Sequence, residues 1–188
     1  MRFLKQAIYD FAEDVVDAAR RNLGAYRTVR GKKRRSVSTG TLKDSLQFKN
    51  KTRGKNITLE FGASGKAEKY AKYVHSGVNG TDKSQGSPFS FKRGGGTKPA
   101  KGQMGVMQQA IYDWIKQKPI RLRNSDGGFI KSTEDARRNA AFLITRSIRK
   151  KGIEANPYYT DAIESELEKH KDKIAEALKQ DVLAVVNL

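Results

Sequence analysis

The side chains that most often carry catalysis or metal binding are scarce in this sequence. His75 and His170 are its two histidines, there is no cysteine, and neither histidine has a second ligand at the spacing typical of metal sites. His170 lies on the apolar stripe of a predicted helix, where a packed, hydrogen-bonded histidine is the expected role. We therefore predict no catalytic residue, no metal site and no cofactor. A hydrolase whose site is assembled from residues distant in the sequence stays open as a third reading.

The glycine run Gly94–Gly96 is the other feature that could bind a ligand. A phosphate-binding loop needs Lys-Ser or Lys-Thr after its glycines and lies between a strand and a helix, and the run meets neither condition. It falls in residues 79–102, which hold six glycines and two prolines. This composition predicts a long flexible loop, which is usually functional or disordered. Phe89 and Phe91 in this loop are candidate interface residues.

Positive charge is the strongest compositional signal. The chain of 188 residues has a formal net charge of +18, and residues 24–56 hold eleven basic side chains and one acidic one. Dense like charge predicts an exposed, flexible basic loop over residues 27–35. Such charge can neutralise phosphates without reading sequence. The candidates for phosphate contacts are Arg27, Lys49, Lys51, Arg53 and Lys55, and a non-specific nucleic-acid-binding protein is our alternative function.

The elements that position these residues follow from the hydrophobic periodicity. Apolar residues from Leu4 to Leu23 recur every three or four positions and predict a helix that ends at Gly24. Alternation around Leu46 and Phe48, and again from Ile57 to Phe61, predicts a β-hairpin.

Three further helices are predicted toward the C-terminus. They cover about 104–117, about 133–151 with a cap at Ser132 or Thr133, and a final helix of about 25 residues. The last helix carries a predicted core stripe, and its charged residues are expected in solvent. The stripe is Ile163, Leu167, His170, Ile174, Leu178, Val182 and Val185; the charged residues are Glu164, Glu166, Glu168, Lys169, Lys173, Glu176 and Lys179.

The length and the order of elements predict one α+β domain over residues 1–188. We expect a small twisted antiparallel sheet packed by an N-terminal helix, two middle helices and a long C-terminal helix. The segments 27–35 and 79–102 would be flexible insertions. No stretch approaches the roughly 20 apolar residues of a membrane span, and four acids within residues 1–22 argue against a signal peptide. We expect no membrane partner.

Three short blocks of the sequence resemble a known family. They are TGTLKDSL (39–46), YAKYVHSGVNGT (70–81) and NPYYTDAI (156–163), in this order between an amphipathic N-terminal helix and a long C-terminal one. They are similar to segments of the tail-completion and head-tail joining family of tailed bacteriophages. There a Gly-x-Leu-x-x-Ser turn leads into the sheet, a Tyr-Ala-x-Tyr-Val segment precedes a turn, and a Pro-aromatic pair opens the last helix.

The resemblance implies a non-enzymatic structural protein of the virion, assembled in the host cytoplasm. It implies a neck or connector role between portal and tail, as a ring of about six or twelve copies that contacts portal, adaptor and tail proteins. DNA in the channel would be a further, non-specific partner. Tyr70, Ala71, Tyr73 and Val74 are expected to form a strand or helix end whose alternate side chains enter the core. The interface candidates are Arg30, Lys32, Lys33, Arg34, Arg35, Tyr70, Tyr73, Phe89, Phe91, Tyr158 and Tyr159.

Overall fold

The chain forms two compact units. A computed structural model describes residues 1–29, 32–35, 40–53, 56–91, 103–117, 121–124 and 126–186. Unit 1 comprises Met1–Ser76 and Ala155–Leu188, and unit 2 comprises Gly77–Glu154. The α+β class predicted from the sequence is confirmed. The single domain over 1–188 stays a prediction. No described helix combines the length and apolar character that crossing a bilayer requires.

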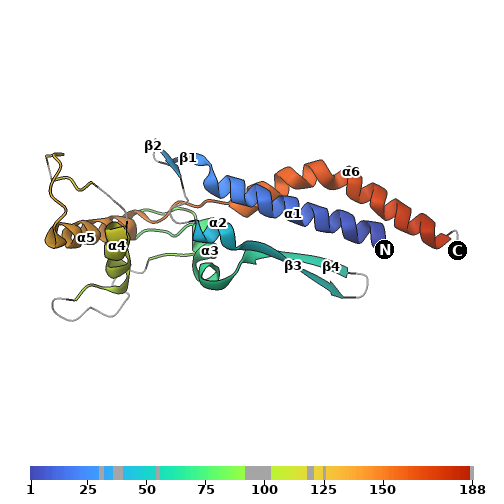
Figure 1. Cartoon of the computed structure of the whole chain (residues 1–188), viewed down its shortest axis with the longest axis horizontal. Helices are drawn as coiled ribbons and strands as arrows, with labels where there is room; N and C mark the ends of the chain where they lie inside the picture. The colour runs from blue at the N-terminus through green and yellow to red at the C-terminus, as the bar shows by residue number, and fades with distance from the viewer. Residues whose placement is uncertain are drawn as a thin grey trace. The chain divides into compact units, whose positions relative to one another are not determined.

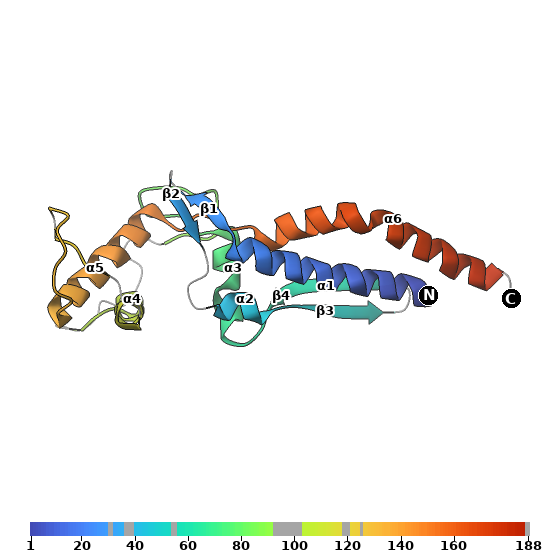
Figure 2. The same ribbon diagram turned by 45° about the horizontal axis from the view of Figure 1, so that its top comes forward.

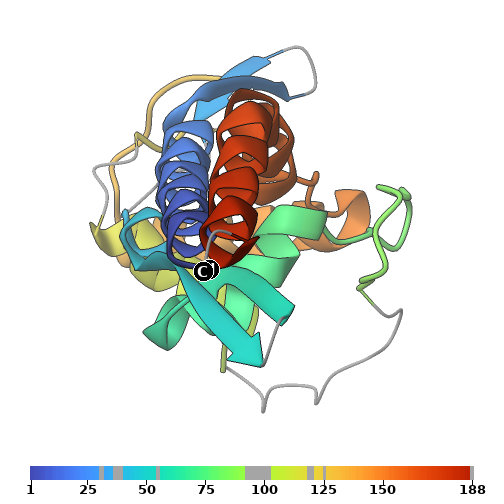
Figure 3. The ribbon, with the colours of Figure 1, turned by 90° about the vertical axis from the view of Figure 1, so that its right-hand side faces the viewer.

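Two long helices form the frame of unit 1. Helix α1 (Arg2–Gly24) and helix α6 (Tyr158–Val186) lie side by side (Figure 1, Figure 3) and contact each other extensively. They run antiparallel, because Asp181 near the end of α6 meets the start of α1 while Tyr158 meets Asn22. Their core side is apolar and rich in alanine, with members from both helices: Phe11, Val15, Val16, Ala18, Ala19, Leu23, Tyr158, Tyr159 and Ala162.

Charged and polar groups are built into this helix pair. His170 Nε2 lies 2.8 Å from the Asp14 carboxylate, and the ring is packed edge-on against Phe11. The Lys169 ammonium lies 2.8 Å from the Glu166 carboxylate, and the Arg21 guanidinium lies 3.7 Å from it. The predicted packed histidine is confirmed. The expectation of an exposed Glu166 is wrong: the side chain is buried because α6 turns this face toward α1, where two cations compensate its charge.

The predicted apolar stripe of α6 is only partly buried. Ile163 and Ile174 pack against the core, as expected. In contrast Leu167, Leu178, Val182 and Val185 are 49%, 44%, 53% and 70% exposed. The buried face is rotated from the predicted one because it is set by Glu166, His170, Ala177 and Asp181.

A β-hairpin completes unit 1. Strands β3 (Leu46–Arg53) and β4 (Asn56–Ala63) pair antiparallel, with Leu46 opposite Ala63 and Phe48 opposite Phe61. β3 contacts α1, alongside which the hairpin runs (Figure 2). The alternation of Ile57, Leu59 and Phe61 with exposed residues confirms the half-buried hairpin predicted from period two.

Short helical segments flank the hairpin. Helix α2 (Thr41–Ser45) begins after Gly40, whose φ of 83° is a left-handed conformation that suits glycine. The 3-10 helix η1 (Gly65–Ala67) leads into α3 (Glu68–Ser76). The segment 70–74 is therefore a helix, and Ala71 and Val74 face the core while Tyr70 and Tyr73 stay half-exposed.

The basic segment 27–35 differs from its prediction. Its described residues belong to strands β1 (Tyr26–Val29) and β2 (Lys32–Arg35), which pair antiparallel in place of an irregular loop. Sequence periodicity could not indicate this hairpin, because the alternating apolar residues typical of strands are absent from its basic arm.

Unit 2 contains the two middle helices. Helix α4 (Val106–Gln117) and helix α5 (Glu134–Lys151) pack against each other over Tyr112, Ile115, Leu122 and Ala141. Thr133 caps α5 by accepting a hydrogen bond from the Ala136 amide at 3.2 Å, as predicted.

Residues 79–91 of the predicted glycine-rich loop have a defined arrangement around Asn79. The side-chain Nδ2 of Asn79 donates to the Ser87 carbonyl at 2.5 Å. The side-chain Oδ1 of Asn79 accepts from the backbone N–H of Gln85 at 2.6 Å. The buried Ser87 hydroxyl donates to the Gly77 carbonyl at 2.8 Å. Side-chain to backbone bonds thus take the place of regular structure in residues 79–91, and the flexibility expected of this segment stays a prediction. Residues 92–102 lie outside the described residues.

Two glycines permit the closest backbone approach in unit 2. Val78 and Ile153 exchange hydrogen bonds of 2.8 Å, which brings Gly80 next to Gly152. A Cβ on Gly80 would lie 2.0 Å from the Lys150 carbonyl oxygen, and one on Gly152 would lie 2.3 Å from the Val78 carbonyl oxygen. Gly152 also has φ 74° and ψ −175°, a region open essentially to glycine alone.

Replacing Gly152 should make local opening of unit 2 easier. We expect Gly152→Ala to lower the free energy of local opening by about 2 kcal/mol or more, because both the backbone conformation and the contact are lost. Amide hydrogen exchange across α5 measures this. Gly105→Ala is the matched control, since a Cβ there meets nothing within 4 Å. Equal protection in both variants would contradict the prediction.

Asp181 is an N-terminal cap supplied by another helix. Met1 gives α1 no side-chain cap, and Asp181 accepts from the amides of Arg2, Phe3 and Leu4 at 2.8, 3.2 and 2.9 Å. The N-terminal ammonium lies 3.4 Å away. Desolvation acts to raise the pKa of Asp181, but these donors together outweigh it and hold that pKa below its ordinary value.

This cap predicts a dependence of stability on pH. Because the folded-state pKa is depressed, the stabilisation is present above the unfolded value of about 3.9 and is lost as pH falls through the folded value. At pH 7 we expect Asp181→Asn to lower the melting temperature by roughly 2–5 °C. The wild type and the variant should converge as the pH drops below about 4. Asp172→Asn, at an exposed acid of the same helix, is the control for charge; a constant difference at every pH would rule out the cap.

Candidate functional site

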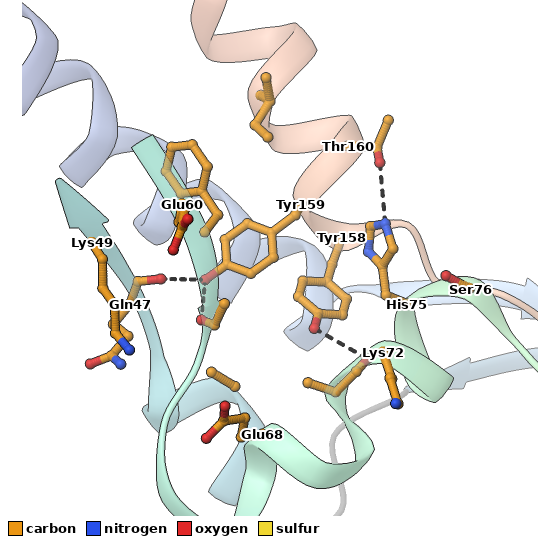
Figure 4. A pocket seen from close by; sticks show the side chains of 15 residues that line it. Gln47, Lys49, Glu60, Glu68, Lys72, His75, Ser76, Tyr158, Tyr159 and Thr160 are labelled. Carbon is orange, nitrogen blue, oxygen red and sulfur yellow. Dashed lines mark hydrogen bonds between the residues drawn. The ribbon is translucent and has the colours of Figure 1, made fainter. Parts of the chain in front are cut away.

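Two of the three sequence blocks, 70–81 and 156–163, contribute to one pocket of unit 1. Its volume is about 610 Å³, and its wall comes from the hairpin β3–β4, from α3 and from the first turns of α6. Figure 4 shows Tyr159 between the hairpin and Tyr158, with His75 and Thr160 facing each other beyond them. The lining residues are Gln47, Lys49, Glu60, Phe61, Gly62, Ala63, Glu68, Ala71, Lys72, His75, Ser76, Tyr158, Tyr159, Thr160 and Ile163.

Tyr159 joins the two strands of the hairpin at the wall of this pocket. Its hydroxyl lies 2.7 Å from the Gly62 carbonyl oxygen and 3.1 Å from the Gln47 carbonyl oxygen, so that its one proton is shared between them. Gln47 and Gly62 are directly paired across the strands. The ring also packs against Phe61 with centroids 5.6 Å apart.

Tyr158 and His75 form the inner end of the pocket. The Tyr158 hydroxyl lies 3.5 Å from the Ala71 carbonyl oxygen, which ties the start of α6 to α3. The His75 ring meets Tyr158 edge-on, with centroids 5.2 Å apart. His75 Nε2 lies 3.2 Å from the Thr160 hydroxyl, whereas Nδ1 is buried and has no hydrogen-bond partner in the part of the chain that the structure describes.

Three ionisable groups of the pocket wall, Tyr158, Tyr159 and His75, are held in their neutral forms. Burial, with a smaller effect of Tyr70, raises the pKa of Tyr158 to about 12. Burial and the neighbouring Tyr158 also raise the pKa of Tyr159 well above its ordinary value. Burial lowers the pKa of His75, against the opposing field of Asp161. At neutral pH the inner pocket therefore offers neutral donors and aromatic faces.

This geometry tests the hydrolase reading. Thr160 and His75 lie at the distance of a nucleophile and its base. A triad also needs a group on the second ring nitrogen that fixes the tautomer and stabilises the imidazolium. His75 Nδ1 lacks such a partner among the described residues, and the lowered pKa of His75 disfavours imidazolium. The pair therefore serves to anchor α3 on α6, and we assign no catalytic role to it.

A second cluster has the residue types of a metal site. Ligand atoms of Asp14, Glu166 and His170 all lie within 4.8 Å of one another. Lys169 and Arg21 are paired with Glu166, so this carboxylate already has two cationic partners. We assign the cluster as an ion-pair network that positions α6 on α1.

The structure distributes the candidate residues over several places. Lys49, Lys51 and Arg53 are exposed on β3, and the Lys51 ammonium lies 2.7 Å from the Glu60 carboxylate. Arg27 belongs to β1, and Lys32, Lys33, Arg34 and Arg35 form β2; Arg30 and Lys55 lie outside the described residues. Of the aromatic candidates, Tyr70 and Tyr73 are half-exposed, and Phe89 and Phe91 of unit 2 are partly buried.

Tyr158 and Tyr159 are the candidates that the structure corrects. They are 2% and 7% exposed, so they form the core of unit 1 and not its outer surface. They follow Pro157 at a helix start, and a Pro-aromatic pair fits a core position as well as a docking corner. Reasoning from the sequence also missed Thr160 and Glu60 as pocket residues, because no short-range pattern links a hairpin to a helix about 100 residues later.

The shared hydroxyl of Tyr159 gives a direct test of this wall. We expect Tyr159→Phe to lower the free energy of unfolding by about 1 kcal/mol, because two strand carbonyls lose their donor. Urea denaturation measures it. Tyr70→Phe, which removes a hydroxyl from a half-exposed ring, should change it by less than about 0.5 kcal/mol. Equal losses would show that the hydroxyl does not join the strands.

The comparisons with known proteins agree with this arrangement. Residues 2–77 match a family model, HK97-gp10_like, described as "Bacteriophage HK97-gp10, putative tail-component". Neither a curated protein nor a solved structure is significantly similar to the chain. The matched residues contain the first sequence block, residues 70–77 of the second, and residues 2–76 of unit 1. The recognition of a phage tail and head-tail joining family from the sequence is confirmed, and residues 2–77, less than half of the chain, are similar to the HK97-gp10-like phage tail components.

Proposed function

We propose that this protein is a non-catalytic structural protein of the phage head-tail connector, a neck or tail-completion ring between portal and tail. The family match supports the coarser statement, that the chain is a structural tail component and part of the virion. Families of structural tail components are generally without enzyme activity. The ring, of about six or twelve copies, and the contacts with portal, adaptor and tail proteins are our proposal.

The observation that carries this proposal is the exposed apolar row of α6. Leu167, Leu178, Val182 and Val185 face solvent, although the same helix buries Glu166, His170 and Asp181. Exposed apolar side chains that follow one helix face are typical of interaction sites. A chain selected only for its own stability would place the leucines inward and the charges outward.

We assign another copy of this chain as the occupant of the row. A ring places the same two surfaces of each copy in contact, so an apolar row repeated on every subunit is buried at every interface. The edges of the row carry both signs of charge, with Glu168 beside Lys171 and Glu176 beside Lys179. Mixed charge of this kind can exchange partners with a neighbouring copy without leaving an unpaired group.

Electron microscopy of lysates tests the connector role. A phage that lacks this chain should give DNA-filled heads beside free tails, because the joining step fails. Supplying the wild-type chain from a plasmid should restore joined particles. Intact tailed particles without the chain would contradict the proposal.

The row itself is tested with purified protein. We expect Leu178→Ser combined with Val182→Ser to lower the oligomer mass measured by light scattering, and to abolish the plasmid rescue. Both side chains are about half-exposed, so the melting temperature of the monomer should change by only a few degrees. Asp172→Ser combined with Gln180→Ser, at two other exposed positions of the same helix, is the matched control. An unchanged oligomer mass in the first variant would exclude the row as an interface.

A further inference from the structure

The last turns of α5 form a cationic face that exposes two large apolar side chains. Residues 142–151 hold four basic side chains and no acidic one. Phe142 and Leu143 are 50% and 61% exposed, and the exposed Arg146 follows them at four and three residues, the spacing that places side chains on one helix face. Arg146 lies about 140° around the helix from the buried Ala141, which packs in the core with α4. The core of unit 2 therefore leaves this face uncovered.

The first turns of α6 carry charge of the opposite sign. Residues 158–168 hold four acidic side chains and no basic one. Leu167, the first member of the exposed apolar row, is 49% exposed, and the exposed Glu164 lies three residues before it on the same side. In the part of the chain that the structure describes, neither Glu164 nor Arg146 has an ion-pair partner. Both groups are thus available to an opposite charge on another molecule.

The helix dipole accounts for only half of this pattern. Acids stabilise the N-terminal end of a helix and bases its C-terminal end, which explains the sign of the charge in each segment. It does not explain why Phe142, Leu143 and Leu167 are exposed among these charges. Exposed apolar side chains with a charged rim are typical of protein interaction sites. Each helix therefore presents one half of a contact, and the two halves are opposite in charge.

We infer that the α5 face of one copy, formed by Phe142, Leu143 and Arg146, docks on the start of the α6 row of a neighbouring copy, at Glu164 and Leu167. The inference rests on the proposed ring and identifies the second surface of its interface. A closed ring joins two different surfaces of each subunit, one on each side. Opposite charge at the rim and apolar side chains at the centre make these two surfaces complementary.

Another copy fits the α5 face better than a polyanion does. Phosphates would neutralise Arg146, but a nucleic-acid backbone offers hydrogen-bond acceptors and no apolar surface for Phe142 and Leu143. The start of α6 offers both a carboxylate and an exposed leucine. Every copy in the assembly carries it, in a fixed ratio of one for each α5 face.

A charge exchange between two purified full-length variants tests the contact by light scattering. Arg146→Glu and Glu164→Arg each place like charges at every interface. Each variant alone should therefore need about tenfold more protein or higher to reach the oligomer mass of the wild type. An equimolar mixture should recover the wild-type mass. In the mixture the altered α5 face meets the altered α6 face, and the other contact is that of the wild type.

Two charge reversals at exposed positions outside the contact are the matched controls. Lys131→Glu precedes α5, and Asp172→Arg lies about 140° around α6 from Leu167. Each should keep the wild-type mass on its own. Circular dichroism verifies that all four variants keep their helix content.

Four results would overturn the inference. They are a monomeric wild type, single variants that keep the wild-type mass, controls that lose as much mass as the variants, and a mixture that recovers nothing. Unchanged mass together with failed plasmid rescue by Arg146→Glu would assign the α5 face to a different virion protein or to DNA.

The connector role is judged separately, from particles in lysates. Intact tailed particles without the chain would remove that role, and a recovered mass in the mixture would still stand. Free tails without the chain, combined with a mixture that recovers nothing, would remove this contact alone.

Discussion

The antiparallel register of α1 on α6 depends on buried charged and polar groups that each have a specific partner. Asp181 holds the first turn of α1, His170 meets Asp14 in the middle, and Glu166 meets Arg21 toward the other end. Sliding one helix along the other by a turn would separate all three contacts at once. A buried charge without its partner costs far more than a lost apolar contact, so one register is selected. The β3–β4 hairpin and the pocket therefore rest on a pair of helices, α1 and α6, whose alignment is set by polar groups.

The same frame explains why apolar side chains are left outside. A helix has a limited inward face, and on α6 that face is occupied by Glu166, His170, Ala177 and Asp181. The leucines and valines of the neighbouring row are displaced toward solvent. Fixing the register and exposing an apolar row are therefore two results of one choice of residues. The buried alanine and aromatic side chains of α1 and α6 supply the apolar contacts that the charged and polar residues of α6 do not provide.

Much of this fold could be predicted from local patterns. Period 3.6 located α1, α4 and α6, and period two located β3 and β4. Thr133 and Gly152 marked the ends of α5 because caps and left-handed glycines have local signatures. Which face of α6 is buried could not be predicted. An apolar stripe favours burial only where no stronger contact competes for the inward position. Glu166 and Asp181 find their partners more than 140 residues away, and no spacing in the sequence records that distance.

The pocket likewise combines features that local patterns predict with features that only tertiary contacts determine. Its blocks were recognisable, yet the buried state of Tyr158 and Tyr159 follows from carbonyls on α3 and the hairpin that only the tertiary structure brings near. The β1–β2 hairpin escaped prediction for the opposite reason. Its basic arm looks unfavourable for any regular element, and the pairing places charges that local rules would keep apart.

The backbone bridge between Val78 and Ile153 has a consequence for the way unit 2 is connected in the chain. It fastens the entry and exit of unit 2 to each other, while Asn156 donates to the Val74 carbonyl and closes the corresponding gap in unit 1. The family match ends at residue 77, at the same junction. A segment whose two ends are clasped adds little loop entropy to its host. Unit 2 thus has the connectivity of an insertion whose two ends lie together, so that its length could change without altering the distance between those ends.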